Sequence, residues 1–374
     1  MEAYLDNSAT TMPCKEAIEA TEKVLRLTWG NPSSLHEKGI QAQEALEGAR
    51  EAVSKKLGCK SEELIFTSGG TQGNNIAVFG AANARKRLGN KVITSSVEHP
   101  SVSKAFDRLE ENGFEVVRLG VDRYGRVDLN ELERELDEKT ILVSVMAVNN
   151  ELGTIEPIKE IAKIVKRNSG ALFHTDCVQA FGKLKLDFKS SGADLMTVSS
   201  HKIHGPKGVG ALAVKEGVRL VSPSVGGGQE RDIRPGTEPM PAIAGFGAAA
   251  EIIDEKNGLA RAQENRTKLL SLLGGLDGAV VNSPEDALPY IVNISLPGYR
   301  SETLLNFLSD NGVYISSGSA CAKGHKSPVL TAAGLDGKII DSSLRISMSP
   351  FTTGEEIEYF VKTLEMATKV IRKK

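Results

Sequence analysis

The segment Ser199-Ser200-His201-Lys202 carries the residue best suited to covalent chemistry in this sequence. It ends an apolar run and precedes a glycine-rich stretch, so we expect the lysine at a strand end, where α/β proteins bind ligands. An amine in such a place can have a lowered pKa and can form a Schiff base with an aldehyde. The alternative is a surface lysine, the commoner state of a lysine considered alone.

Asp176 is the second candidate, because it follows the apolar residues 171–175. We expect its carboxylate to be partly buried at the same edge of the sheet. A buried carboxylate needs a cationic partner, and a protonated pyridine nitrogen of a bound cofactor would provide one. The alternative is a helix N-cap, a position where aspartate is also favoured.

The segment Ser68-Gly69-Gly70-Thr71 lies between an expected strand and an expected helix. Glycine lets the backbone approach a ligand closely, and the N-terminus of a helix offers N–H groups to a phosphate. The segment matches neither of the common glycine-rich nucleotide motifs. A plain strand-to-helix turn is therefore the alternative.

The four cysteines, at positions 14, 59, 177 and 321, form no CxxC pair, so we expect no metal centre built from paired thiolates. Cys321 differs from the others because it lies in a loop of Gly, Ser and Ala followed by basic residues at 323–326. Nearby cations favour the thiolate, which is the nucleophilic form. Cys14 and Cys59 are expected to be structural, while the role of Cys177 stays open.

Three further polar residues belong to expected strands or follow them. His99 follows the strand at 91–95, and its imidazole could stack on a planar cofactor, move protons or be structural. Asn150 follows an apolar strand, and its amide could bind ligand oxygens or make a turn. Arg345 is a charge inside an apolar strand, which calls for a carboxylate partner from the protein or from a substrate.

The elements that must position these residues alternate between strand and helix over the middle of the chain. Strands are expected at residues 63–67, 91–95, 114–119, 140–146, 171–175, 195–199 and 208–214, with helices at 71–88, 101–112, 128–136 and 157–168. This alternation predicts a mostly parallel sheet covered on both faces, with the last strand antiparallel. Long helices follow from 239 to 274, then strands near 290–295, 312–315 and 344–347. A helix after Thr353, with Glu356 completing a capping box, ends a smaller α/β domain.

Composition narrows the function classes. The chain has 374 residues, with 46 Lys and Arg against 48 Asp and Glu, for a net charge of −2. This balance gives no reason to expect a nucleic acid or an anionic membrane surface as the main partner. No stretch approaches the roughly 20 apolar residues of a membrane span, and the first residues resemble no export signal. We therefore expect a cytoplasmic protein with free thiols.

Taken in order, the motifs resemble those of cysteine desulfurases of the NifS/IscS type, in the class V aminotransferase group of fold-type I pyridoxal phosphate enzymes. The matching segments are residues 4–11, 30–36, 96–99, 148–153, 174–176, 199–202, 234–237, 317–321 and 351–353. The resemblance implies a large domain with a seven-stranded, mostly parallel sheet, at residues 13–254. It also implies a small domain, built from residues 1–12 and 255–374, that carries the loop of Cys321.

The resemblance assigns cofactor contacts to particular residues. Lys202 would hold pyridoxal 5′-phosphate as a Schiff base, Asp176 would pair with its ring nitrogen, and His99 would stack on its ring. Gln179 and Asn150 would lie at its phenolic oxygen. The phosphate would be held by Gly70, Thr71, Ser199 and His201, and by Thr237 from the neighbouring subunit of a homodimer. No metal site is implied.

The implied reaction removes sulfur from L-cysteine, giving L-alanine and a persulfide on Cys321. Asn150 and Arg345 would bind the substrate carboxylate, and Lys202 would act as the base. The sulfur would pass to an acceptor protein, either an iron–sulfur scaffold or a tRNA-thiolation enzyme. A selenocysteine lyase, or another class V aminotransferase-type enzyme, is the alternative. The sequence departs from the family pattern at Cys177, at Pro350 and in the short basic segment after Cys321.

Overall fold

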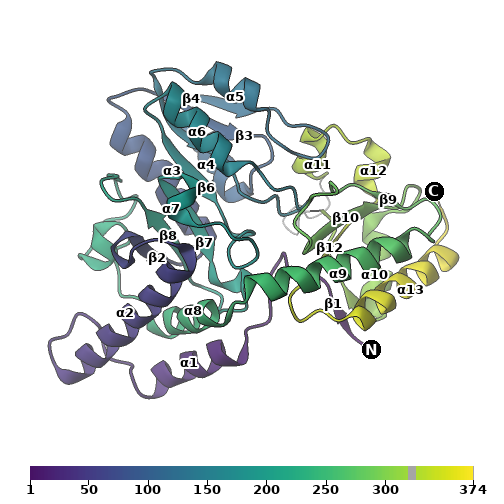
Figure 1. The fold of residues 1–374 in the computed structure, drawn as a ribbon, viewed down its shortest axis with the longest axis horizontal. Helices are drawn as coiled ribbons and strands as arrows, with labels where there is room; N and C mark the ends of the chain where they lie inside the picture. The colour runs from purple at the N-terminus through teal and green to yellow at the C-terminus, as the bar shows by residue number, and fades with distance from the viewer. Residues whose placement is uncertain (319–325, 374) are drawn as a thin grey trace.

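The computed structural model of the chain describes residues 1–318 and 326–373, and Figure 1 shows its fold. A seven-stranded sheet forms the larger part, in the order β2-β8-β7-β6-β5-β3-β4. β8 pairs antiparallel with both neighbours, and the other pairings are parallel, so the predicted mostly parallel sheet with one antiparallel strand is confirmed. Its strands are β2 (Leu64–Thr67), β3 (Lys91–Ser95), β4 (Glu115–Leu119), β5 (Thr140–Ser144), β6 (Leu172–Asp176), β7 (Leu195–Ser199) and β8 (Gly210–Val214).

Helices cover both faces of this sheet because neighbouring strand residues point to opposite sides. Leu172 and Leu195 join the apolar cluster formed with α3 and α4, while Phe173 and Met196 join the cluster formed with α1, α2, α6 and α8. Both faces of every strand of this sheet except the edge strand β4 are thus buried, which explains the continuous apolar runs in the sequence. The helices are α1 (Lys15–Arg26), α2 (Glu37–Leu57), α3 (Gly70–Arg85), α4 (Pro100–Glu111), α5 (Leu129–Glu135), α6 (Ile158–Asn168), α7 (Phe188–Ser191) and α8 (Met240–Ile252).

The C-terminal part has its own apolar cluster, which also takes in Ala3 and Leu5 from the start of the chain. It contains a parallel pair, β1–β11, and an antiparallel sheet in the order β12-β10-β9. The elements are β1 (Ala3–Tyr4), α9 (Glu255–Leu273), β9 (Val280–Val281), β10 (Ile291–Ser295), α10 (Ser301–Asp310), β11 (Val313–Tyr314), α11 (Pro328–Ala332), α12 (Gly337–Asp341), β12 (Ser343–Ser347) and α13 (Gly354–Val370). The expected domain limits at residues 12/13 and 254/255 stay a prediction.

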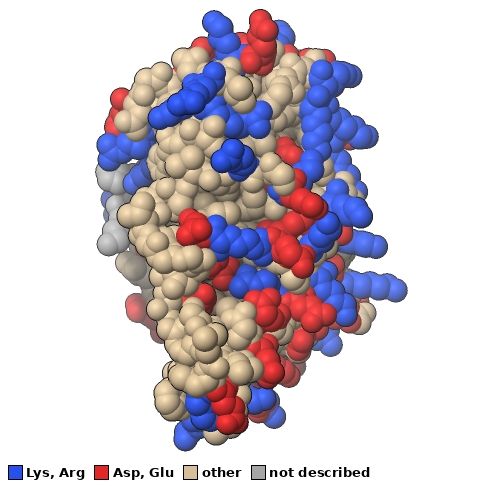
Figure 2. All heavy atoms as spheres, turned by 90° about the vertical axis from the view of Figure 1, so that its left-hand side faces the viewer, with Lys and Arg blue, Asp and Glu red and all other residues tan. Residues whose placement is uncertain are grey.

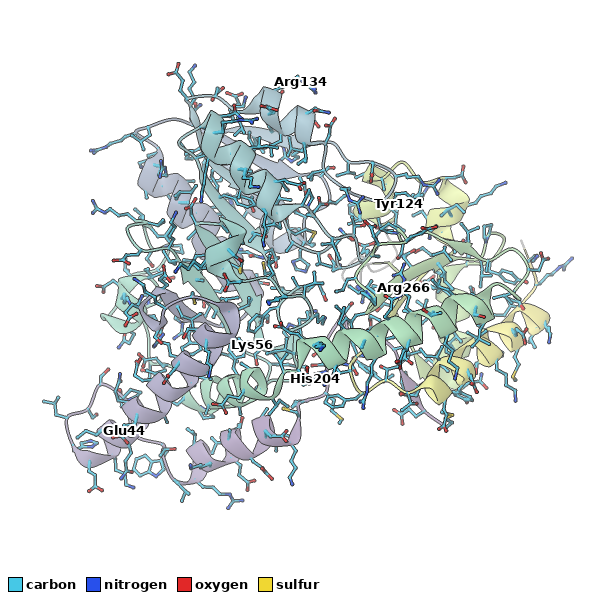
Figure 3. All side chains as sticks on the ribbon, in the orientation of Figure 1. Glu44, Lys56, Tyr124, Arg134, His204 and Arg266 are labelled. Atoms are coloured by element: carbon cyan, nitrogen blue, oxygen red, sulfur yellow. The ribbon has the colours of Figure 1, made fainter. Side chains whose placement is uncertain are left out.

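Two basic residues tie α9 to its surroundings, and both are labelled in Figure 3. Lys56 of α2 donates to the Ile253 carbonyl (2.9 Å) just before α9 begins, and Arg266 of α9 donates to the Pro284 carbonyl (2.6 Å). At the end of the chain, the predicted capping box of α13 is confirmed, with Thr353 and Glu356 each accepting from the other's backbone N–H. Among the helices described, none has the length and apolarity needed to cross a bilayer.

Candidate active site

One cavity of about 540 Å³ lies where β3, β5, β6 and β7 end, as expected for ligands of a parallel sheet. The residues predicted for the site line it almost without exception: Gly70, Thr71, His99, Asn150, Asp176, Gln179, Ser199, His201, Lys202 and Arg345. Segments of the chain far apart in sequence, from Ser8 to Arg345, therefore converge on one volume. Cys321 lies outside the described residues.

Lys202 reaches the cavity from the single turn Ser200–Lys202 that follows β7. Its Nζ donates to the Ala9 carbonyl (2.8 Å) and to the Ser8 carbonyl. The amine thus meets the first residues of the chain, a contact that the periodicity of the sequence does not predict. These carbonyls fix the position of the amine within the cavity.

Asp176 is the last residue of β6, and only 5% of it is exposed. Its Oδ1 accepts from the Val178 backbone N–H (2.9 Å), the local bond that a capping aspartate makes. Its Oδ2 accepts from Asn74 Nδ2 (2.7 Å), which belongs to α3 and is 102 residues away in the sequence. The carboxylate is therefore held by a long-range contact as well as a local one, which a simple cap would not require.

Asn74 and Ser101 join Asp176 to His99, and the sequence analysis did not single out either of them. Asn74 Nδ2 donates to Ser101 Oγ (2.8 Å) as well as to Asp176, and Ser101 Oγ lies 2.8 Å from His99 Nδ1. The available signal was weak: Asn74 is a polar residue four positions after Gly70, on a helix face that is otherwise small or apolar.

His99 caps α4, and its Nδ1 accepts from the Ser101 backbone N–H (3.2 Å). Since Nδ1 accepts, the proton of the neutral ring lies on Nε2. Burial lowers the pKa of His99; the Asp176 carboxylate opposes this shift and the Lys202 amine adds to it. The ring is thus uncharged near neutral pH, in a form suited to stacking.

The start of α3 forms the end of the cavity expected to hold a phosphate. A Cβ at Gly70 would lie 2.7 Å from Val178 Cγ2, so the backbone approaches the turn after β6 too closely for a side chain. Ser199 Oγ is buried and has no hydrogen-bond partner in the structure. Burial, with Lys202 and Lys207 nearby, lowers the pKa of His201 to about 4, so its ring is a neutral donor or acceptor.

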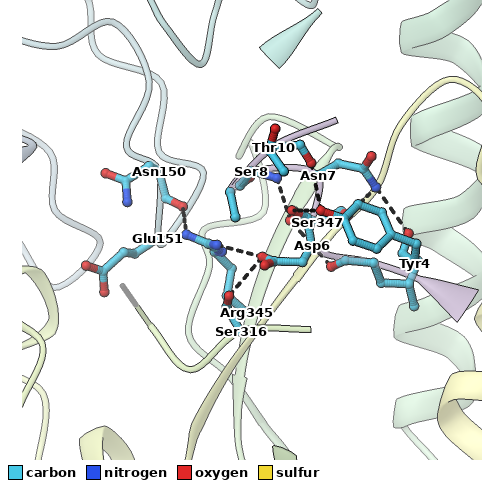
Figure 4. A network of polar contacts seen from close by, with 12 residues as sticks. Tyr4, Asp6, Asn7, Ser8, Thr10, Asn150, Glu151, Ser316, Arg345 and Ser347 are labelled. Carbon is cyan, nitrogen blue, oxygen red and sulfur yellow. Dashed lines mark hydrogen bonds and ion pairs between the residues drawn. The ribbon is translucent and has the colours of Figure 1, made fainter. Parts of the chain in front are cut away.

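The opposite end of the cavity is formed by Arg345 in the middle of β12, which is 2% exposed (Figure 4). Its Nη2 pairs with Asp6 Oδ1 (2.8 Å), and its Nη1 donates to the Asn150 carbonyl (3.2 Å). Ser316 Oγ also donates to Asp6 Oδ1 (2.9 Å). The carboxylate partner expected for this arginine is therefore supplied by the protein, while Arg345 Nε is buried without a partner among residues 1–318 and 326–373.

Lys183 is a buried amine that the sequence analysis did not single out, although it lies one helical turn after Gln179. Its Nζ donates to Gln179 Oε1 (3.2 Å), and Gln179 Nε2 donates to the Ser8 carbonyl (3.0 Å). Burial, with Lys202 and Arg345 nearby, lowers the pKa of Lys183 to about 7. The amide of Gln179 is thus fixed from both sides.

Thr237 does not reach this cavity in the single chain. It lines another hollow of about 320 Å³, beside Trp29 and Gly30. Its expected role in a neighbouring subunit stays a prediction. Over the residues that the structure describes, no group of three or more His, Cys, Asp or Glu side chains could hold a metal ion.

The three described thiols lie apart from the predicted chemistry. Cys177 is buried, and burial raises its pKa far above the ordinary value of a thiol. Burial also raises the pKa of Cys59, to about 12, and that of Cys14. These thiols therefore stay protonated and poorly nucleophilic.

Comparison with known proteins agrees with this site. The family model described as Aminotransferase class-V matches residues 3–360. A "NifS/IcsS protein homolog" of Lactobacillus delbrueckii subsp. bulgaricus is 44% identical, over 97% of this chain and 96% of its own. "Cysteine desulfurase IscS" of Methanosarcina thermophila is 40% identical, over 99% of this chain and 92% of its own.

A solved structure titled "NIFS-LIKE PROTEIN" superimposes with a TM-score of 0.95 at 38% identity, covering 99% of this chain and all of its own. The family match spans nearly the whole chain, and so do the relatives. The chain therefore belongs to the class-V aminotransferase family, among its NifS/IscS-type cysteine desulfurases, whose cofactor is pyridoxal 5′-phosphate.

Proposed function

We propose that this chain is a cysteine desulfurase that takes sulfur from L-cysteine, releases L-alanine and holds the sulfur as a persulfide on Cys321. The observation that carries the proposal is the single cavity in which Lys202, Asp176 and Arg345 meet. It offers an amine, an anion and a guanidinium in one volume. These are the groups needed to hold pyridoxal phosphate and to bind an amino acid beside it.

The cavity fits pyridoxal phosphate because it contains buried polar atoms without partners, namely Ser199 Oγ, Ser8 Oγ and Asn74 Oδ1. The phosphate would be held by the N-terminus of α3 at Gly70 and Thr71, with Ser199 and His201. Gln179 and Asn150 would hydrogen-bond the phenolic oxygen. When bound, the cofactor supplies an aldehyde that condenses with amines and a ring that withdraws electrons from the substrate Cα.

Asp176 and His99 would hold the ring. The Asp176 carboxylate would keep a proton on the ring nitrogen, because a buried anion stabilises a cation beside it. The neutral His99 ring would stack without adding charge. The hydrogen bonds through Asn74 and Ser101 fix the two side chains relative to each other.

Lys202 would bind the aldehyde at rest and, once displaced by the substrate amine, would take the proton from the substrate Cα. The carbonyls of Ser8 and Ala9 already fix this amine in the cavity. Arg345 would bind the substrate carboxylate, since its Nε is buried without a partner. Asp6 would keep the guanidinium oriented.

The sulfur step needs a thiolate beside the substrate. The Cys321 thiolate would attack the substrate sulfur and form an S–S bond while the C–S bond breaks; the carbon keeps the bonding pair, takes up a proton and leaves as alanine. After 319–325 the described chain continues along the cavity, and before it Gly318 lies near Glu151, which lines the cavity. Lys326 lines it, and Ser327 Oγ, 2.5 Å from Glu151 Oε2, lies against Gly318. This placement of the flanks supports Cys321 as the acceptor.

We also propose that the active enzyme is a homodimer in which Thr237 completes the partner's phosphate site. Leu25, Leu27 and Trp29 are 60% or more exposed around the end of α1, and Trp29 lies beside Thr237. Exposed apolar side chains gathered in this way are typical of an interface. Figure 2 shows a broad uncharged area on the face seen from the side of α2, with charged side chains gathered along one edge. Sedimentation of the active enzyme as a monomer would contradict this proposal.

The sulfur acceptor we propose is a protein of iron–sulfur cluster assembly or of tRNA thiolation, in the cytoplasm. Incubating the persulfide form with a purified iron–sulfur scaffold or with a tRNA-thiolation enzyme separates the two. The acceptor that takes sulfur from Cys321 in a single turnover is the partner.

Product analysis tests the proposed reaction. The purified chain, supplied with pyridoxal phosphate, L-cysteine and a reductant, should release alanine and sulfide in equal amounts. Exchange of amino groups with a keto acid, without sulfide, would instead identify an aminotransferase. Turnover of L-selenocysteine without turnover of L-cysteine would identify a selenocysteine lyase.

A further inference from the structure

Glu98 is a second buried carboxyl group at the active-site cavity, and the proposed reaction gives it no role. It lies between β3 and α4, directly before His99, and is 6% exposed. Its Oε1 accepts from Ser95 Oγ (2.6 Å), at the end of β3, and from the Met146 backbone N–H (2.9 Å), after β5. The side chain thus joins the ends of two neighbouring strands.

The other oxygen of Glu98 has a different environment, because Oε2 is buried and has no hydrogen-bond partner in the structure. A charged carboxylate with one unsolvated and unpartnered oxygen is costly to bury. A protonated carboxyl group is less costly to bury, because it carries no charge. Ser95 and Met146 both donate to Oε1, so the proton can lie on Oε2. The hydrogen-bond pattern therefore favours the acid form, with its proton on the buried Oε2.

The charged groups around Glu98 favour the same form. Asp176 at the end of β6 and Glu156 after β5 are the titratable neighbours that act on it most, and both are carboxyl groups. His99, which follows it in the chain, is neutral near pH 7, and Lys202 lies on the same cavity. Burial raises the pKa of Glu98 to about 8; the bonds from Ser95 and Met146 oppose the shift, and the two carboxyl groups add to it.

We propose that Glu98 is an uncharged carboxylic acid that positions the ends of β3 and β5 at the cavity and leaves Asp176, rather than Glu98, to pair with the cofactor ring. Glu151, a third buried carboxyl group on the cavity, accepts a hydrogen bond from Ser327 Oγ instead. This inference rests on the proposed placement of the cofactor against Asp176. A second anion beside Asp176 would compete for the proton of the ring nitrogen. Glu98 is thus a positioning residue. Its proton keeps it uncharged, so that it differs from the Asp176 carboxylate.

The pH dependence follows from the sign of the shift. Because the folded pKa lies above the ordinary value for glutamate, the folded chain keeps a proton that the unfolded chain loses, and stability falls as pH rises from about 4.5 to about 8. Glu98→Gln removes this loss, so the variant should gain stability relative to the wild type over that interval. Above about pH 8 the difference should level off.

The matched control is Glu156, another buried carboxyl group whose pKa burial raises to about 8, but which does not line the cavity. Glu156→Gln should gain stability over the same pH interval, without changing how cofactor binding depends on pH. Glu98→Gln should change both the stability and the pH dependence of cofactor binding. Comparing the two variants therefore separates a role at the cofactor from the cost of burying a carboxyl group.

The decisive experiment measures the dissociation constant of pyridoxal phosphate for the full-length wild type, Glu98→Gln and Glu156→Gln from pH 6 to 9. We expect the ratio of the Glu98→Gln constant to the wild-type constant to fall about tenfold between pH 7 and 9, as Glu98 ionises in the wild type alone. Glu98→Leu, which cannot accept from Ser95 or Met146, should bind the cofactor more weakly than Glu98→Gln at every pH. A pH-independent ratio, or loss of cofactor from Glu98→Gln at pH 7 equal to that of Asp176→Asn, would overturn the proposal.

Infrared spectroscopy of the cofactor-free wild type and of cofactor-free Glu156→Gln provides a second measurement, which does not depend on the reaction or on Glu98→Gln folding. The carbonyl band of a protonated carboxyl group should be present at pH 7 and should remain in Glu156→Gln. Its absence from Glu156→Gln would show that Glu98 is ionised and would refute the proposal. Desulfuration of L-cysteine by the wild type is measured separately, so failure of the proposed function is recognised independently.

Discussion

The two ends of the active-site cavity differ in how the protein satisfies their polar groups. At the cofactor end, Ser199 Oγ and Asn74 Oδ1 are buried without partners. At the substrate end, Arg345 already binds the Asp6 carboxylate and the Asn150 carbonyl. The neutral groups Ser199 Oγ and Asn74 Oδ1 need a ligand that stays. The charge of Arg345 is already balanced by Asp6, and only its Nε finds no partner among the described residues, so it can bind and release a carboxylate at little cost. The difference suits a permanent cofactor at one end and a transient substrate at the other.

The largest effect is expected at the cofactor end. Lys202→Ala removes both the amine that binds the aldehyde and the base, so alanine formation from L-cysteine should fall at least about a thousandfold. Spectroscopy should also show that the cofactor absorption of the wild type is lost. Lys215→Ala, which removes a half-exposed lysine paired with Asp194, is the control and should keep both. Normal turnover by Lys202→Ala would refute the assignment of the cofactor end.

A smaller and different effect is expected at the substrate end. Arg345→Lys keeps the charge but loses the planar fork, so kcat/KM should fall about tenfold to a hundredfold, mainly through KM. Cofactor absorption should stay unchanged, because Arg345 belongs to the substrate end. Steady-state kinetics and a cofactor titration of the same preparation check both statements. An unchanged KM, or loss of cofactor, would remove the distinction between the two ends.

The smallest of these effects concerns the hydrogen bonds that support the ring partners. Asn74→Ala removes the donor shared by Asp176 and Ser101, so kcat should fall about tenfold, as expected for one hydrogen bond to a charged group. The pH range over which the cofactor absorption changes should also differ from that of the wild type, because Asp176 loses one hydrogen-bond donor. Asn75→Ala, which removes the next amide of α3 without touching Asp176, is the control. Equal effects of the two variants would mean that loss of either amide from α3 lowers kcat, and that the hydrogen bond from Asn74 to Asp176 has no particular role.

Much of the architecture was predictable because the apolar strands are continuous and end in polar residues. Lys91–Ser95 and Leu195–Ser199 were expected to the residue, and the limits of the other expected strands differ from the structure by no more than two residues. The residues that end these strands, such as Asp176 and Ser199, must meet at one edge of a parallel sheet. Their convergence on one cavity follows from that topology.

The partners of these residues could not be predicted, because they come from distant elements. The bond from Asn74 to Asp176 spans 102 residues, and the pair of Arg345 with Asp6 spans 339. Nothing in the local pattern around Asn74 or Asp6 records such a contact. The contribution expected from Thr237 needs a second chain, and Cys321 lies outside the described residues.

The central claim is that sulfur moves from L-cysteine to one particular thiol. Mass spectrometry of the purified, cofactor-loaded chain after a single turnover, digested without reductant, tests it directly. The account predicts one added sulfur atom on the peptide that contains Cys321, none on those of Cys14, Cys59 or Cys177, and no added sulfur in Cys321→Ser. Sulfur on Cys177, or alanine release by Cys321→Ser with sulfur on another thiol, would contradict it.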